Sequence, residues 1–451
     1  MQELKNSVEW EFLLKNNPSM DIKKLALKLY IKHYKNNASV RNFFALLSLD
    51  IIVKAGMVIL IPLYTQLMSK EDFGVFNYLF FYVSTVSLIL NFGMYVPHNK
   101  LLNQNPLTEH PVINGTIFLL FFVPNFLIAF CILIFEWDLW IAKALFYNSD
   151  IQFEVFRYAL QFAVFSAAFN FMLNGWLLAT RKVKLIQKIQ IFRFLVHIPV
   201  LLGLYFQWSK QPVMFRLWSY YGLDFLITLI AFMSQQFEIQ WKIQKKLLKN
   251  IFKIAFPIFL NAIFAIVLNF LDKLYLENSF YHTQMPSYAL ATQLASIVPI
   301  VSLSFLNVML PDFLKVNNLE QNFSHTLRTE KRLFALLFFA GFCIWIATII
   351  GLFFHVFPSS YYDVVWVLMF LIIAKIIEAL AQLYVRFTIL LEKTWISLVY
   401  SFIAAPIAFL LNIYFVPVYG MSACVMVVFL NSIFTYFFFK TVISWQVEKN
   451  S

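Results

Sequence analysis

The sequence predicts an all-α polytopic membrane protein, with about twelve transmembrane helices in two six-helix lobes. Three observations predict this class: an extreme apolar composition, a regular series of apolar runs of membrane-spanning length, and basic residues placed in every second loop. Of the 451 residues, 61% are hydrophobic and only 13% are charged. Soluble domains are typically about 45–50% apolar and about 25% charged. Much of the apolar surface of this chain must therefore face lipid.

The apolar runs are long enough to cross a bilayer, because a hydrocarbon core of about 30 Å needs about 20 mostly apolar helical residues. Twelve such runs lie near residues 42–68, 74–97, 112–135, 154–179, 190–207, 213–234, 251–273, 286–311, 332–356, 362–386, 396–416 and 421–443. Arginines interrupt the fourth, fifth and sixth runs, at Arg157, Arg193 and Arg216.

The loops between these spans predict the orientation. Lys and Arg concentrate in both termini and in every second loop, whereas the intervening loops hold few, chiefly Lys70, Lys143 and Lys210. Because cytoplasmic loops carry the excess of basic residues in membrane proteins, both termini are expected in the cytoplasm. The same placement accounts for the net charge of +12 and argues against a nucleic-acid partner.

The N-terminal segment is charged and shows no cleavable signal peptide. Within it, lysines and apolar residues alternate at helical spacing over 21–32. This pattern predicts either an amphipathic helix on the cytoplasmic leaflet or a solvated helical extension. The expected division of the chain is a cytoplasmic segment (1–41), a first lobe (42–235), a basic cytoplasmic linker (236–250), a second lobe (251–445) and a cytoplasmic tail (446–451). An even number of spans in each lobe makes the two lobes candidates for parallel repeats.

Ionisable residues inside the predicted spans need an explanation, because each costs about 2.5–3.5 kcal/mol on insertion scales. They are Asp50 and Lys54 in the first span, Arg157 in the fourth, Arg216 and Asp224 in the sixth, Asp272 and Lys273 in the seventh, and Lys375 and Glu378 in the tenth. Charges paired on one helix can simply fix helix packing, and arginines near span ends can extend to the interface. If the first, seventh and tenth spans face one another, the same charges line a water-filled cavity of both signs.

The chemistry of such a cavity assigns candidate roles. Basic side chains suit an anionic headgroup such as pyrophosphate, which lysine binds as a point charge. The candidate substrate-binding residues are Lys54, Lys375, Lys273 and Arg157. Carboxylates suit proton or sodium coupling, and the candidate ion-coupling residues are Asp272, Asp50 and Glu378. No catalytic residue, metal or cofactor is expected, because the three cysteines lie in apolar runs and show no metal-ligand spacing.

Three stretches carry a family resemblance. They are Lys54-Ala55-Gly56 through Ser69-Lys70-Glu71-Asp72-Phe73-Gly74, then Ala255-Phe256-Pro257 with Phe270-Leu271-Asp272-Lys273-Leu274, and Tyr288-Ala289-Leu290-Ala291. With the twelve-span plan over residues 42–445, they resemble the Wzx-type polysaccharide flippases of the multidrug/oligosaccharidyl-lipid/polysaccharide (MOP) exporter superfamily. Two features depart from the pattern: the N-terminal extension, and Gln66 where a basic residue is common in the family.

The resemblance implies a MATE-like pair of lobes that alternate access to a central cationic cavity. It implies a cargo of undecaprenyl-pyrophosphate-linked oligosaccharide, moved from the cytoplasmic to the periplasmic leaflet of a bacterial inner membrane. The cargo would serve the assembly of a surface polysaccharide such as the O-antigen of lipopolysaccharide. The implied partners are the lipid bilayer, H⁺ or Na⁺ as coupling ion, and a polymerase or glycosyltransferase.

Two other functions remain open on the sequence. A drug or cation antiporter of the same superfamily predicts a cavity of carboxylates and aromatics, and Lys54, Lys273 and Lys375 count against it. A membrane-embedded polysaccharide polymerase or glycosyltransferase usually needs extended outer loops that carry its catalytic groups. Here the outer loops are short, and the longest loop, 312–331, is on the predicted cytoplasmic side.

Overall fold

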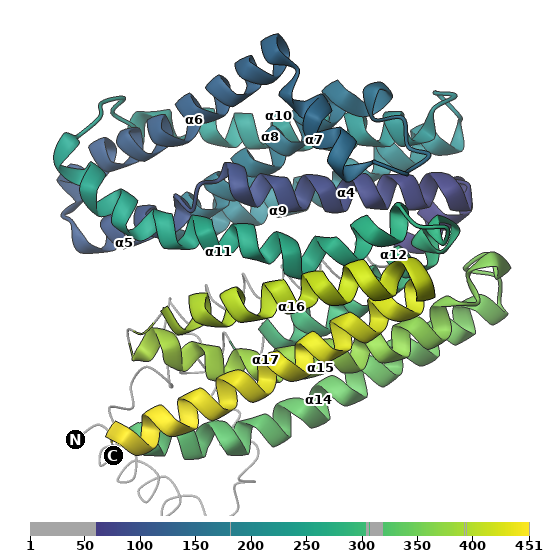
Figure 1. The fold of residues 1–451 in the computed structure, drawn as a ribbon. Coiled ribbons are helices and arrows are strands. Elements are labelled where there is room, and N and C mark those ends of the chain that lie inside the picture. The colour runs from purple at the N-terminus through teal and green to yellow at the C-terminus, as the bar shows by residue number, and fades with distance from the viewer. Residues whose placement is uncertain are drawn as a thin grey trace, which may run out of the picture. The chain divides into compact units, whose positions relative to one another are not determined.

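The computed structural model describes residues 60–180, 182–303, 306, 319–391, 393 and 395–450, and these residues contain no β-strand. Their helices are α4 (Lys70–Leu90), α5 (Tyr95–Gln104), α6 (His110–Phe135), α7 (Trp137–Leu145), α8 (Phe153–Ala179), α9 (Val183–Tyr205), α10 (Pro212–Met233), α11 (Lys245–Glu277), α12 (Met285–Ala295), α14 (Leu319–Phe353), α15 (Val364–Leu390), α16 (Trp395–Tyr419) and α17 (Met421–Asn450) (Figure 1). A further helical stretch, 60–67, precedes α4. The predicted all-α class is confirmed.

Eleven helical segments of the described residues are long and apolar enough to cross a membrane. Each coincides with one of the predicted spans, from the second to the twelfth. The first predicted span, 42–68, lies mostly outside the described residues, and so does the predicted N-terminal segment, 1–41. The chain is a multi-pass membrane protein.

The second predicted span, 74–97, is shorter in the structure because the chain turns before it ends. Helix α4 stops at Leu90, and the next turn contains Phe92 and Gly93, with φ of 51° and 67°. A left-handed backbone favours glycine, and at Gly93 an added Cβ would lie 2.7 Å from the carbonyl oxygen of Ala255 in α11. The turn therefore starts α5 as a separate helix that packs against α11.

The start of α4 follows from its local sequence. Ser69 caps the helix, since its Oγ accepts a hydrogen bond from the backbone N–H of Asp72 at 3.0 Å. Glu71 and Asp72 then place negative charge in the first turn, next to the unpaired amides and the positive end of the helix dipole. This end of α4 lines a cavity of about 730 Å³ that is described below.

The helices pack mainly within two groups that follow one another along the chain (Figure 1). In the first group α10 packs on α8 and α9, and α8 also contacts α4 and α5. In the second group α15 packs on α17, α14 and α12, while α16 packs on α11 and α17. Helix α4 joins the groups through α11 and α12, and Gly74 permits the approach: an added Cβ would lie 2.6 Å from Pro286 Cγ. The lobe boundaries 42–235 and 251–445 stay predictions.

The predicted linker, 236–250, is held against the first group of helices. The backbone N–H of Gln240 donates to the carbonyl of Pro111 at 2.8 Å, and Thr116 Oγ1 donates to the carbonyl of Lys242 at 2.9 Å. A Cβ added at Gly115 would lie 1.7 Å from the carbonyl oxygen of Gln240. The irregular stretch before α11 therefore lies directly on α6, and the end of the predicted linker already belongs to α11, which begins at Lys245.

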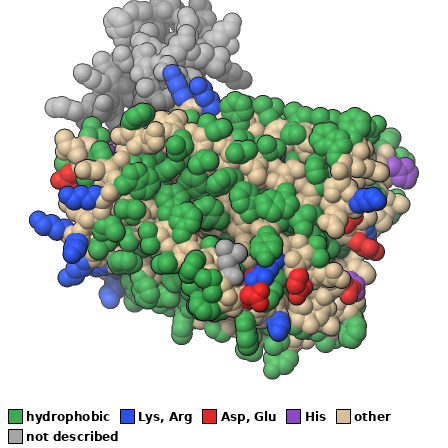
Figure 2. Space-filling view, turned by 90° about the horizontal axis from the view of Figure 1, so that it is seen from above, with side chains coloured by type: hydrophobic (Ala, Val, Ile, Leu, Met, Phe, Trp, Pro, Cys, Tyr) green, Lys and Arg blue, Asp and Glu red, His purple; other side chains and the backbone are tan. Residues whose placement is uncertain are grey.

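The surface agrees with a membrane location. In Figure 2 hydrophobic side chains cover the middle of the visible face, while Lys and Arg gather towards its left end and most Asp and Glu lie in the right half. Large apolar side chains are exposed on many of the long helices, among them Phe126 and Phe130 on α6, Phe339 on α14 and Phe402 on α16. Such a broad apolar surface is stable only when lipid covers it.

Candidate functional site

Four of the predicted site residues line one cavity in the second group of helices, with a volume of about 290 Å³. Helix α11 provides Asp272 and Lys273, and α15 provides Lys375 and Glu378. The sequence indicated these charges from their positions on the seventh and tenth spans. The structure places them in the same cavity, whose lining also includes polar side chains of α12, α16 and α17.

Asp272 and Lys273 form a buried ion pair in the lining of this cavity. Lys273 Nζ lies 2.9 and 3.0 Å from the two carboxylate oxygens of Asp272, and it also donates to the carbonyl of Asn269 at 2.8 Å. The hydroxyl of Tyr288, on α12, donates to the same carboxylate. Only 8% of the Lys273 side chain and 4% of the Asp272 side chain are exposed. The carboxylate is thus held by donors from two helices.

Lys375 and Glu378 form a second, more open pair. Their Nζ and Oε2 atoms lie 2.7 Å apart on consecutive turns of α15, and 24% and 40% of the side chains are exposed. In each pair both partners belong to the same helix. The two pairs together give the cavity two cations and two anions. A polar lining surrounds them: Asn261, Asn269, Thr292, Gln382, Ser397, Tyr400, Ser401, Asn431, Ser432 and Thr435.

Three predicted site residues remain, and the structure describes one of them, Arg157. Lys54 and Asp50 are outside the described residues. Arg157, at the start of α8, does not line the cavity: its Nε and Nη2 donate to the two carboxylate oxygens of Asp138 at 2.5 and 2.8 Å, and its Nη1 lies 3.2 Å from Glu136. The structure therefore gives Arg157 an ion pair with the start of α7 rather than a place among the cavity cations.

Sequence reasoning missed two features of the first group of helices. Arg216, expected to extend to the interface, is instead buried with 8% of the residue exposed. Asp224 pairs with Arg193, whose Nε donates to its Oδ1 at 2.6 Å. The available signal was the pair of arginines inside predicted spans, but their partners come from other helices and leave no fixed spacing in the sequence.

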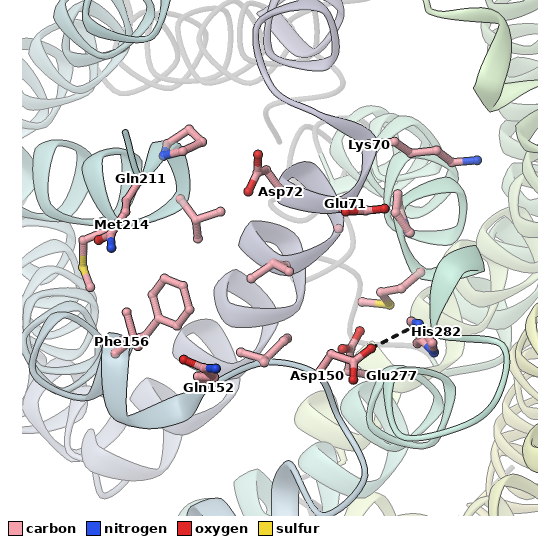
Figure 3. Close-up of a pocket in the computed structure, with 18 of the residues that line it drawn as sticks. Lys70, Glu71, Asp72, Asp150, Gln152, Phe156, Gln211, Met214, Glu277 and His282 are labelled. Carbon is pink, nitrogen blue, oxygen red and sulfur yellow. Dashed lines mark ion pairs between the residues drawn. The ribbon is translucent and has the colours of Figure 1, made fainter. Parts of the chain in front are cut away.

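Another cavity, of about 730 Å³, lies where the two groups of helices meet (Figure 3). Asp150, Glu277 and His282 gather on one side of it, with His282 Nε2 and Asp150 Oδ2 3.4 Å apart. Lys70 and Lys210 also line it, and both belong to loops predicted to be extracytoplasmic. No group of three His, Cys, Asp or Glu side chains within the described part of the chain is arranged to hold a metal ion.

Polar contacts connect the two groups of helices beside this cavity. The backbone N–H of Asn148 donates to Asn278 Oδ1 at 2.9 Å, and Asn148 Nδ2 donates to the carbonyl of Asn278 at 3.0 Å. Ser149 Oγ donates to Glu277 at 2.8 Å, and Lys70 Nζ donates to the carbonyl of Ser360 at 2.6 Å. The helices are therefore joined on the predicted extracytoplasmic side.

This arrangement of helices is that of a multi-pass membrane protein, and solved structures share the fold. The chain superposes on an inward-facing multidrug resistance MATE family transporter of the MOP superfamily with a TM-score of 0.65, 13% identity, and coverage of 91% of this chain and 99% of that one. The lipid II flippase MurJ in an inward closed conformation gives a TM-score of 0.62 at 13% identity, with coverage of 89% of this chain and 86% of that one. A Vibrio cholerae MATE transporter gives a TM-score of 0.61 at 11% identity, with coverage of 91% of this chain and 97% of that one. At these identities the likeness defines the fold, which is MATE- and MurJ-like.

The family follows from the sequence. A family model described as "polysaccharide biosynthesis protein" matches residues 63–365, about two thirds of the chain. No curated protein matches the chain significantly. The chain belongs to the polysaccharide biosynthesis protein family, and the resemblance to polysaccharide flippases of the MOP superfamily is confirmed at the level of family and fold.

Proposed function

We propose that this chain is a flippase that moves an undecaprenyl-pyrophosphate-linked oligosaccharide from the cytoplasmic to the periplasmic leaflet. It works by alternating access in a bacterial inner membrane, with both termini in the cytoplasm, and serves the assembly of a surface polysaccharide such as O-antigen. Membership of the polysaccharide biosynthesis family and a fold shared with a lipid II flippase support the proposal.

One observation carries the proposal: a polar cavity with two cations and two anions lies between helices of membrane-spanning length. Ionisable groups at such positions are costly, and they mark substrate or ion pathways in membrane proteins. A protein that only anchored or scaffolded a biosynthetic complex would have no use for this cavity. Apolar side chains in its place would pack at lower cost.

The roles within the cavity follow from the geometry of its two pairs. Asp272 is proposed as the main coupling group, because a buried carboxylate held by Lys273 and Tyr288 changes its partners when a proton or sodium ion binds. Lys375 and Glu378 form the open pair, so Lys375 is free to exchange Glu378 for an anionic group of the cargo. Lys54 and Asp50, on the first predicted span, are proposed to add to substrate binding and coupling, and a polymerase or glycosyltransferase is the proposed partner.

A second function, drug or cation export, is favoured by the similarity of fold to a MATE transporter over 91% of the chain. In the second group of helices each lysine of the cavity is neutralised by a neighbouring carboxylate, which weakens the argument from the lysines against this function. The two functions differ in their cargo, so the lipids of the cell discriminate between them.

The decisive experiment deletes the gene and measures polyprenyl-pyrophosphate lipids by mass spectrometry. We expect a complete, unpolymerised lipid-linked oligosaccharide to accumulate while surface polymer is lost. Complementation with Asp272→Asn should fail at a normal protein level, whereas Arg328→Gln, an exposed change outside the cavity, should restore the polymer. An unchanged lipid profile in the deletion strain would rule out the flippase and leave drug export as the favoured function.

A further inference from the structure

Helix α11 begins with four exposed lysines that share one face. Lys245, Lys246, Lys249 and Lys253 lie within about a third of the circumference of the helix, because an α-helix has about 3.6 residues per turn. Ile251, on the other side of the same turns, is fully buried against the rest of the protein. The four lysines form the α11 basic face, at the start of a helix that is long and apolar enough to cross a membrane.

The charge of the α11 basic face is not compensated by the described part of the chain. None of its four ammonium groups forms an ion pair or a hydrogen bond with a described residue. Lys182, at the start of α9, shows the contrast: its Nζ lies 2.5 Å from Glu238 Oε2 and it also donates to Gln235. The basic face is therefore available to an anion from outside the protein.

The first turn of a helix is also an unfavourable place for cations, because the free N–H groups and the helix dipole are positive there. Helix α4 follows this rule, with Ser69 as its cap and Glu71 and Asp72 in its first turn. Helix α11 departs from it: its first turn has no acidic residue, and Gln244 at the N-cap makes no side-chain hydrogen bond. The orientation of the protein needs lysines in this loop, but it does not need them on one face of a helix.

Two aromatic side chains extend the same face towards the apolar part of α11. Phe252 and Phe256 follow Lys245 by seven and eleven residues, so they lie on its side of the helix, and more than half of each residue is exposed. At a rise of 1.5 Å per residue, Phe256 lies about 16 Å beyond Lys245 along the axis. Positive charge followed by apolar rings matches the order of a phospholipid, whose phosphate lies at the surface and whose acyl chains lie deeper.

The chain before α11 gives the basic face a fixed place. Asn114 Nδ2 donates to the carbonyl of Glu238 at 2.9 Å, and Thr116 Oγ1 accepts a hydrogen bond from the backbone N–H of Gln244 at 3.1 Å. Both donor and acceptor side chains belong to α6, so the segment is held on the first group of helices. A surface that is already ordered loses little conformational entropy when a ligand binds.

We propose that the α11 basic face binds the headgroups of anionic phospholipids, such as phosphatidylglycerol, at the membrane surface. Several lysines beside a membrane span attract anionic lipid, and each ammonium meets a phosphate as a point charge. Phe252 and Phe256 lie against the acyl chains of the bound lipid. The lipid is a component of the bilayer and not the cargo, so this site does not depend on the proposed flippase. Only its placement in the cytoplasmic leaflet rests on the proposed topology.

The test measures lipid binding to the delipidated full-length protein in detergent by native mass spectrometry. Dioleoyl phosphatidylglycerol and dioleoyl phosphatidylcholine have the same acyl chains, and only the first carries a net negative charge. We expect the first phosphatidylglycerol to bind at least about tenfold more tightly than phosphatidylcholine. Lys246→Gln combined with Lys249→Gln should remove at least about tenfold of this affinity, because two phosphate contacts are lost. Equal binding of the two lipids to the wild type would overturn the proposal.

Two further variants separate the basic face from net charge and from misfolding. Lys210→Gln combined with Lys449→Gln removes the same charge from two exposed lysines on separate elements, and it should bind phosphatidylglycerol as the wild type does. Lys246→Arg combined with Lys249→Arg keeps the charge and should keep the affinity within about threefold. A loss in the Lys210 and Lys449 variant as large as in the Lys246 and Lys249 variant would overturn the site.

The source of the phosphate is decided by competition. Glycerol 1-phosphate has the charge of the headgroup without acyl chains, and at the same concentration it should not displace phosphatidylglycerol. Phe252→Ala combined with Phe256→Ala should weaken phosphatidylglycerol binding about threefold, since apolar contact with the acyl chains is lost. Equal displacement by glycerol 1-phosphate would mean that the face binds a soluble anion, and the assignment to lipid would fail.

Discussion

The polar cavity of the second group of helices and the interior of the first group handle buried charge in different ways. In the cavity the pairs Asp272–Lys273 and Lys375–Glu378 are one and three residues apart, so each closes within its own helix. In the first group Arg193 and Asp224 lie on α9 and α10 and are 31 residues apart. His98 and Asn114 likewise join α5 to α6.

The difference teaches which charges hold the fold and which are available to a ligand. A pair that spans two helices fixes their packing, and losing one partner leaves a buried charge on a helix that cannot move away. A pair within one helix adds little to packing, because both side chains travel with the same helix. Under the proposed function the cavity pairs exchange partners during transport, with Asp272 also giving up its contact with Tyr288 of α12, whereas the pairs of the first group hold helices together.

Breaking the pair of Arg193 and Asp224 should have the largest effect on stability. Asp224 also accepts a hydrogen bond from Asn170 at 2.8 Å, and Arg193 donates to Thr228 at 3.1 Å. Asp224→Ala leaves the guanidinium buried and unpaired, which costs about 3–5 kcal/mol of unfolding free energy. We expect a lower yield of folded protein and a lower thermal unfolding midpoint in detergent.

The matched control replaces both partners with apolar residues of similar size. Arg193→Met combined with Asp224→Leu removes the pair without leaving a charge, and such replacements are often neutral in protein interiors. The double variant should recover most of the stability lost in Asp224→Ala. A double variant as unstable as the single one would show that the pair is not the cause.

The spans and the cavity pairs could be predicted from the sequence because both depend on local spacing. A long apolar run predicts a membrane span, and charged residues three positions apart share a helix face, as Lys375 and Glu378 do. The arginine partners could not be predicted, because Arg157–Asp138 and Arg193–Asp224 depend on how separate helices pack. The same limit applies to Arg216: nothing in its own span shows that its guanidinium lies 3.6 Å from the ring centres of Tyr64 and Phe76.

Acidification should destabilise the first group of helices by a smaller amount, through His98. Its Nε2 donates to Asn114 Oδ1 at 2.8 Å, and burial lowers the pKa of the imidazole to about 4 from its usual 6.5. The unfolded state therefore binds more protons between these values, and stability falls as pH drops through 6.5 towards 4. At pH 5 the loss is about 2 kcal/mol relative to neutral pH.

The measurement compares the thermal unfolding midpoint at pH 7.5 and pH 5 for the wild type and for His98→Gln. Glutamine keeps a donor for Asn114 but does not titrate, so the variant should lose less stability on acidification. Equal pH dependence in both proteins would place the titrating group elsewhere.

Disrupting the open pair of the cavity should have the smallest effect on stability. Lys375→Met leaves Glu378 with 40% of its side chain exposed, so solvent in the cavity can replace the lost partner. We expect a change of less than about 1 kcal/mol in unfolding free energy, as for exposed ion pairs. Surface polymer should nevertheless be reduced in the complementation assay, because the proposed anion contact is gone. A destabilisation as large as that of Asp224→Ala would mean that Lys375 and Glu378 hold the helices together, and the distinction between structural and exchangeable pairs would fail.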